Sequence, residues 1–150
     1  MKVSLYRVLL ISAALLLSAC SHASLHDQDG HEIDLTAHPN QWLVVHYWAP
    51  WCKICQKELP EINHFYLTHT PQVLVYGFDY DAPSPQALAK IRKQKGIDFP
   101  LLVEDPQPLL GIQENIQAVP ITFIYNPQGK LLHVLKGPHT AKQLSLMTTG

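Results

Sequence analysis

The feature that most constrains this chain is an apolar strand that runs directly into two closely spaced cysteines. Residues 43–47 form the near-continuous apolar run of a strand that is covered on both faces. From Cys52 to about Leu67, apolar residues recur at the spacing of an amphipathic helix. The pattern therefore predicts an α/β fold in which Cys52 and Cys55 lie where the strand ends and the helix begins.

The alternation of strand and helix continues along the chain. Asp29 and Gly30 give a turn signal between short apolar segments, which predicts a small N-terminal hairpin. The later elements expected from apolar spacing and from proline and glycine positions are a strand at 73–78, a helix at 82–95, a short strand at 99–103, a helix at 106–114, a hairpin of strands at 121–125 and 131–135, and a last helix at 140–147.

The position of the two cysteines favours thiol chemistry. Unpaired backbone N–H groups and the helix macrodipole stabilise a thiolate at a helix N-terminus, and Cys55 follows one turn further in. The positive charge of Lys53, between the two cysteines, also favours a thiolate. We therefore predict that Cys52 is the nucleophile and Cys55 the resolving thiol.

Three separated motifs together resemble the thioredoxin superfamily and, within it, the TlpA/ResA-like thiol-disulfide oxidoreductases of bacterial envelopes. They are the Trp-Cys-x-x-Cys run at 51–55, Pro60 inside the following helix, and Val119-Pro120 before a late strand. The resemblance implies a thioredoxin-like fold: a central mixed sheet flanked by helices, with an N-terminal hairpin and an extra strand-helix insertion. The implied function is disulfide exchange with exported proteins through a redox-active Cys52–Cys55 disulfide, without another cofactor.

The resemblance also assigns roles around the dithiol. In this family the proline corresponding to Pro120 is cis and faces the cysteines, which leaves the backbone of the preceding residue, here Val119, free to pair with a substrate. Taken alone, Pro120 would be read as a residue that merely begins a strand. Trp51 is the aromatic residue best placed to contact substrate.

Two residues are candidates to take the proton of Cys55. His46 stands six residues before Cys52, where relatives have an acid or an amide, and its place on the strand directs the ring under the helix. Its imidazole would titrate near neutral pH, unless it is a core histidine bonded to a backbone carbonyl. Glu58 lies one turn after Cys55, where the TlpA/ResA-like branch often has an acid, although a solvated helix face would explain it equally well.

The beginning of the chain predicts export. Lys2 and Arg7 precede an apolar run at 8–17 that is too short to span a membrane comfortably. The residues up to Cys20 resemble a bacterial lipoprotein box, which implies that Cys20 is lipidated. Cleavage after Ala23, or an uncleaved anchor, would be the alternatives.

Length and charge set the remaining expectations. A chain of 150 residues with 47% hydrophobic residues has the size of one domain, so we expect a signal peptide at 1–19, a tether at 20–29 and a thioredoxin-like domain at 30–150. The net charge of −1, without a basic patch, argues against nucleic acid as a partner. We expect a periplasm-facing, lipid-anchored protein, with the outer membrane favoured over the inner. Its expected partners are cysteine-containing exported proteins and a membrane redox protein that recycles the dithiol.

The direction of exchange stays open at this point. The Lys53-Ile54 pair matches neither the Gly-Pro of reducing thioredoxins nor the Pro-His of strong oxidants, while the resemblance favours a reductant of the cytochrome c maturation or disulfide repair type. An oxidising or isomerase-type exchanger is one alternative, a copper-binding dithiol module is another, and a purely structural domain is a third. No metal site is expected, since a structural zinc site needs two further ligands and the chain has no second Cys pair.

Overall fold

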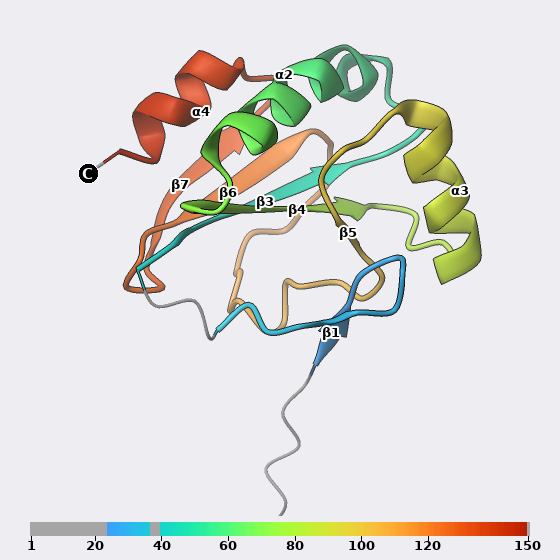
Figure 1. The fold of residues 1–150 in the computed structure, drawn as a ribbon, viewed down its shortest axis with the longest axis horizontal. Coiled ribbons are helices and arrows are strands. Elements are labelled where there is room, and N and C mark those ends of the chain that lie inside the picture. The colour runs from blue at the N-terminus through green and yellow to red at the C-terminus, as the bar shows by residue number, and fades with distance from the viewer. Residues whose placement is uncertain (1–23, 37–39, 150) are drawn as a thin grey trace, which may run out of the picture.

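The computed structural model describes residues 24–36 and 40–149. They form a two-stranded hairpin and a five-stranded sheet of order β5-β4-β3-β6-β7. The strands are β1 (Leu25–His26), β2 (Glu32–Ile33), β3 (Trp42–Trp48), β4 (Val73–Asp79), β5 (Leu101–Leu102), β6 (Ile121–Tyr125) and β7 (Leu131–Lys136), and the helices are α2 (Lys53–His69), α3 (Pro85–Lys95) and α4 (Ala141–Met147). This is the predicted thioredoxin-like α/β architecture, with helices above the sheet and the hairpin below it in Figure 1.

Strand β3 lies at the centre of the sheet. It pairs in parallel with β4 and antiparallel with β6, so the sheet is mixed, as predicted. Every residue of β3 after Trp42 is buried. A strand that has a neighbour on each side and is covered on both faces must be apolar almost throughout. This explains the apolar run at residues 43–47 from which the strand was predicted.

Two hydrophobic clusters lie on opposite faces of the sheet. The first joins β3 and β4 to the three helices, with Trp48, Phe65 and Leu144 among its fully buried members. The second lies between the sheet and the hairpin, where the ring of Tyr47 meets Phe78 and Phe123 edge-on at centroid distances of 5.2 and 5.6 Å. The sheet therefore holds the end of β3, and the cysteines that follow it, against a packed core on both sides.

The N-terminal hairpin is attached to strand β5. Gln28 donates its backbone N–H to the carbonyl of Leu101 (3.0 Å), and its side-chain Oε1 accepts the N–H of Leu101 (2.6 Å). Because Leu25 and Gln28 are buried in this contact, the folded domain starts before the boundary predicted at residue 30. The predicted signal peptide and Cys20 lie outside the described residues.

The structure corrects the predicted helix at 106–114. The inserted strand exists as β5, but residues 107–111 form turns and residues 112–117 form neither helix nor strand. Pro108 has no N–H to donate, and Gly111 has a left-handed φ of +61°, so the turn cannot continue as a helix. The apolar residues that suggested a helix, Leu109 and Leu110, pack instead against the cluster beneath the sheet.

A smaller correction concerns the start of α3. The helix was expected from residue 82 but begins at Pro85, with Ser84 as its N-cap. Ala82 has a φ of +45° and closes a turn by donating its N–H to the carbonyl of Asp79 (2.8 Å). The helix ends as predicted at Gly96, whose left-handed conformation caps it.

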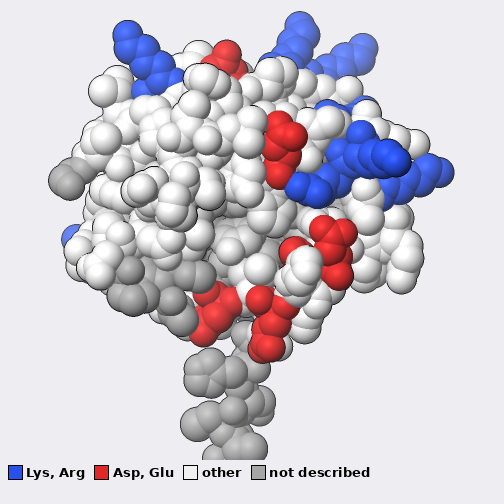
Figure 2. Space-filling model, viewed as in Figure 1, with Lys and Arg blue, Asp and Glu red and all other residues white. Residues whose placement is uncertain are grey.

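Charged residues are distributed unevenly over the surface. Figure 2 shows lysine and arginine side chains gathered over α3, whose last turn carries Arg92, Lys93 and Lys95, and acidic side chains nearer the hairpin. Within residues 24–36 and 40–149, no helix has the length and apolar character needed to cross a bilayer.

Candidate active site

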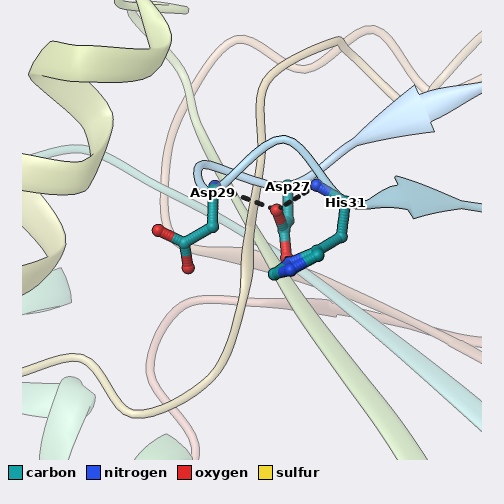
Figure 3. A group of neighbouring side chains, drawn as sticks. All are labelled: Asp27, Asp29 and His31. Carbon is teal, nitrogen blue, oxygen red and sulfur yellow. Dashed lines mark hydrogen bonds and ion pairs between the residues drawn. The ribbon is translucent and has the colours of Figure 1, made fainter.

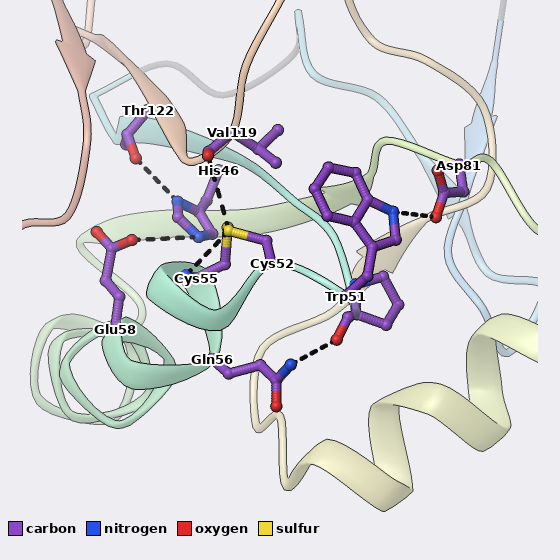
Figure 4. The surroundings of a disulfide bond; sticks show 10 residues. His46, Trp51, Cys52, Cys55, Gln56, Glu58, Asp81, Val119 and Thr122 are labelled. Carbon is purple, nitrogen blue, oxygen red and sulfur yellow. Dashed lines mark hydrogen bonds and ion pairs between the residues drawn. A yellow bond between two sulfur atoms is a disulfide. The ribbon is translucent and has the colours of Figure 1, made fainter.

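The two cysteines form a disulfide at the N-terminus of α2. Cys52 is the N-cap residue, in an extended conformation, and its Sγ accepts the backbone N–H of Cys55 at 3.1 Å. Figure 4 shows this sulfur above the first turn of the helix. A backbone N–H aimed at sulfur, together with the positive end of the helix dipole, stabilises a thiolate when the disulfide is reduced.

The two sulfur-bearing residues differ in accessibility. Cys52 retains 8% of its surface, whereas Cys55 is fully buried. Cys52 is therefore the more exposed of the two residues. The roles predicted for them, nucleophile for Cys52 and resolving thiol for Cys55, stay predictions.

The late Val-Pro motif lies beside Cys52. The peptide bond between Val119 and Pro120 is cis, and the carbonyl oxygen of Val119 lies 3.7 Å from the Sγ of Cys52. Pro120 is buried. The fold thus brings together residues 67 positions apart in the chain, an arrangement that the family resemblance had implied.

The loop before Cys52 is held by three side chains that the sequence gave no reason to single out: Gln56, Asp81 and Lys95. Trp51 is 62% exposed, yet its Nε1 donates to Asp81 at 2.8 Å (Figure 4). Gln56 donates to the carbonyl of Pro50 (2.6 Å) and accepts from Lys95 (3.1 Å). Asp81 and Lys95 come from the turn after β4 and from α3, so only the folded chain reveals these contacts.

His46 is fully buried beneath α2. Its Nδ1 lies 2.9 Å from the hydroxyl of Thr122, its neighbour across the β3–β6 ladder, rather than near a backbone carbonyl. Its Nε2 lies 3.9 Å from Oε2 of Glu58, without a hydrogen bond to any described residue. Burial, aided by the nearby His139, lowers the pKa of His46 to about 3. The expectation that this imidazole titrates near neutral pH is therefore wrong.

Glu58 is the group whose titration falls near neutrality. Its side chain is buried, which excludes the solvated helix face considered above. Its Oε1 accepts the N–H of His139 at 2.8 Å, while its Oε2 has no hydrogen-bond partner in the described part of the chain. Burial raises the pKa of Glu58 to about 7, against the opposing effect of the His139 hydrogen bond.

A second group of ionisable side chains lies in the hairpin, away from the disulfide. Asp27, Asp29 and His31 bring ligand-type atoms within 4.8 Å of one another (Figure 3). The Asp27 carboxylate accepts the backbone N–H groups of Asp29 and His31, both at 2.9 Å, and lies 2.9 Å from Nδ1 of His31. These bonds are those of a side chain that closes a turn.

A comparison with family models decides where this chain belongs. Residues 18–134, which include both cysteines and the Val-Pro motif, match the model of the AhpC/TSA family. The chain belongs to the AhpC/TSA family. It is a thiol-disulfide oxidoreductase, because the redox-active geometry around Cys52 and Cys55 accompanies a consistent set of relatives.

Those relatives share both sequence and fold with this chain. The thiol-disulfide oxidoreductase ResA of Bacillus thuringiensis (strain Al Hakam) is 27% identical over 119 residues, which cover 79% of this chain and 68% of ResA. The sporulation thiol-disulfide oxidoreductase A of Bacillus subtilis (strain 168) is 27% identical over 125 residues, covering 80% and 73%. The crystal structure of StoA from Bacillus subtilis superposes with a TM-score of 0.67 at 25% identity, covering 82% of this chain and 92% of StoA.

Proposed function

We propose that this oxidoreductase works as a reductant of cysteine pairs in exported proteins. The observation that carries the proposal is the unequal burial of the two cysteines: Cys52 keeps 8% of its surface exposed at a helix N-terminus, beside the Val119 carbonyl, while Cys55 is fully buried. The similarity to ResA and the resemblance to envelope reductants support the direction.

The reaction requires two successive attacks. The Cys52 thiolate attacks one sulfur of a substrate disulfide, forms a mixed disulfide and releases the first substrate thiolate. Cys55 then gives up its proton and attacks the Sγ of Cys52, which releases the second substrate thiolate and leaves the Cys52–Cys55 disulfide. Two electrons pass from the dithiol to the substrate, and a recycling partner must return them.

We propose that Glu58 is the base that accepts the proton released by Cys55. A buried thiol has a raised pKa and needs a nearby base, and a carboxylate whose pKa is about 7 suits that task at neutral pH. His46, which stays neutral, is better placed as a positioning residue: it lies between Thr122 and Glu58 and limits where the carboxylate can lie.

Substrate contacts follow from the same geometry. Trp51 offers an exposed aromatic face beside Cys52, and the Val119 backbone lies where an extended substrate chain would pass. In this proposal the cis peptide bond before Pro120 sets how the Val119 backbone meets the substrate chain.

A redox titration of the Cys52–Cys55 pair tests the direction of exchange. A reduction potential of about −270 mV, typical of reducing thioredoxins, is the expected result, whereas a value of about −120 mV would make the protein an oxidant. The same measurement, repeated after addition of Cu(I), would reveal the dithiol copper module considered as an alternative.

We further propose that the protein is attached to the cell envelope by lipid at Cys20, facing the periplasm. The lipoprotein-like residues before Cys20 support this placement, and a membrane redox partner would then recycle the dithiol. Cell fractionation with Cys20→Ala tests it: the variant should leave the membrane fraction, and a variant that is still processed and membrane-bound would contradict the lipid anchor.

A further inference from the structure

We infer that His139 is a positioning residue for Glu58: its ring closes the turn between β7 and α4, and the closed turn aims the backbone N–H of His139 at one oxygen of the Glu58 carboxylate. The inference rests on the proposed role of Glu58 as the base for Cys55 and adds the residue that holds this base. The shape of the turn, its two backbone anchors and the burial of the carboxylate carry it.

The turn has the sequence Gly137-Pro138-His139, and a side chain closes it. Gly137 has a left-handed φ of +87°, which residues with a side chain rarely adopt. Its carbonyl oxygen lies 2.9 Å from Nδ1 of His139. A carbonyl oxygen can only accept a hydrogen bond, so Nδ1 carries a proton and donates it. The ring of His139 therefore binds the backbone two residues earlier and sets the shape of the turn.

Backbone hydrogen bonds anchor the turn on both sides of Pro138, which has no N–H of its own. Before it, the N–H of Gly137 donates to the carbonyl of Pro120 at 2.9 Å. After it, the N–H of His139 donates to Oε1 of Glu58 at 2.8 Å. The ring contact and the two backbone bonds together direct the His139 N–H towards the carboxylate.

Glu58 depends on this donor because its surroundings offer little else. Its side chain is fully buried, and its second oxygen, Oε2, has no hydrogen-bond partner in the described part of the chain. Burial raises the pKa of Glu58, and the hydrogen bond from His139 opposes that effect because it stabilises the charged carboxylate. Without this bond the buried carboxyl group should hold its proton more tightly.

The other titratable side chains around the carboxylate do not replace the donor. His46 faces it from β3, but its Nε2 is 3.9 Å from Oε2, too far for a hydrogen bond. Lys57 and Glu61, on the same helix as Glu58, line a cavity of about 270 Å³ together with Glu58 and His139. Lys57 is exposed, and Glu61 binds the first N–H of α4 instead. The proton affinity of Glu58 should therefore respond to the turn.

The test measures the Glu58 carboxyl group itself by NMR. Oxidised protein is isotope-labelled at the glutamate carboxyl carbons, and the Glu58 signal is assigned by its loss in Glu58→Gln. The wild-type titration midpoint should lie at about 7. His139→Ala should raise it by about one pH unit, because a buried carboxylate loses a charge-assisted hydrogen bond.

Two further variants separate the positioning bond from other properties of the ring. The amide N–H of His139→Asn can occupy the place of Nδ1 and donate to the Gly137 carbonyl, so this variant should return the midpoint close to the wild-type value. The amide of His139→Gln reaches the place of Nε2 instead, so this variant should behave like His139→Ala. If His139→Ala does not fold, the difference between the Asn and Gln variants decides.

Gln143→Ala is the matched control for a loosened α4. Gln143 accepts the N–H of Thr140 at 2.8 Å, so its loss weakens the start of the helix without removing a contact of the turn. The Glu58 midpoint should stay at the wild-type value. An unchanged midpoint in His139→Ala, no recovery in His139→Asn, or an equal shift in Gln143→Ala would each overturn the inference.

The rate of mixed-disulfide resolution separates this result from the proposed function. If the rate follows the NMR midpoint through the His139 variants, the positioning role and the base role both hold. If the midpoint moves but the wild-type rate has no step near pH 7, His139 positions a carboxyl group that is not the base for Cys55. If Glu58→Gln removes the step but His139→Ala does not move it, Glu58 is the base and the positioning role fails.

Discussion

Two of the acid-histidine pairs in the described part of the chain differ sharply in their surroundings, one exposed and one buried. In the hairpin, Nδ1 of His31 lies 2.9 Å from Asp27, and the His31 side chain is 75% exposed. Beneath the active-site helix, His46 and Glu58 lie 3.9 Å apart with both side chains fully buried. The hydrogen bond to Asp27 raises the pKa of His31, whereas burial lowers that of His46 and raises that of Glu58.

The comparison shows that residue types alone do not determine the charge of such a pair. Water and backbone N–H groups stabilise the charged forms in the hairpin, which favours an ion pair between Asp27 and the protonated imidazole of His31. Loss of hydration favours the neutral forms in the core, so Glu58 keeps its proton up to about pH 7. A carboxyl group that titrates near neutral pH can accept the proton of a thiol and release it again. A carboxylate held in an ion pair is a poorer proton acceptor.

The largest expected effect comes from removing the titrating carboxyl group. Glu58→Gln should slow resolution of the mixed disulfide by about 10²- to 10⁴-fold, because the Cys55 proton loses its acceptor. The wild-type resolution rate should rise with pH through about 7, and the variant should lack that step. Stopped-flow measurement of the release of the second substrate thiol reports this rate.

Glu61→Gln is the matched control. Glu61 lies on the same helix and also accepts a backbone N–H from the start of α4, that of Ala141 at 2.8 Å. Equal slowing in both variants would mean that the two carboxylates affect the rate by holding α4 in place, and that Glu58 is not the base. If His46→Gln abolished the pH step as completely as Glu58→Gln, the imidazole would be the base after all.

The next effect is on the pH dependence of stability. Unfolded His46 binds a proton below about pH 6.5, while the folded protein keeps it neutral down to about pH 3, so acidification through this window favours unfolding. His46→Gln should therefore lose less stability than wild type as the pH falls from 6.5, by about 1.4 kcal/mol per pH unit. Chemical denaturation at a series of pH values measures the difference.

Glu58→Gln should change the pH dependence of stability in the opposite direction in the same experiment. The folded carboxyl keeps its proton up to about pH 7 but the unfolded one only to about 4.5, so the wild-type contribution is present at low pH and is lost as the pH rises between these values. The Gln variant should lose less stability over that rise. Identical slopes for wild type and both variants would show that neither buried group has a shifted pKa.

The smallest effect is expected in the hairpin. The stability contributed by protonated His31 is present at low pH and is lost as the pH rises through its raised pKa, and solvent screens the exposed pair. In an NMR titration, the His31 ring should change charge above the ordinary histidine value, while the His46 ring shows no transition between pH 5 and 8. His31→Ala should leave the rate of disulfide exchange unchanged, and a reduced rate would link the hairpin to the active site.

The sequence predicted those parts of the molecule that depend on interactions between residues close to one another in the chain. These parts are the apolar run of β3, the position of Cys52 at a helix start, the end of α3 at Gly96 and the terminal hairpin, which can all be read from neighbouring residues. The helix predicted at 106–114 failed because its apolar residues serve the cluster beneath the sheet, while Pro108 and Gly111 disfavour helical continuation.

The sequence by itself determined the chemistry available to this protein: a dithiol at the N-terminus of a helix, a late Val-Pro motif, and an acid and a histidine near the cysteines. The tertiary structure decided which of these groups can change charge. His46 and Glu58 belong to different elements, and their pKa values depend on the water excluded when α2 packs on the sheet and His139 lies over Glu58. Desolvation is a property of the whole packed core, so spacing along the chain cannot reveal it.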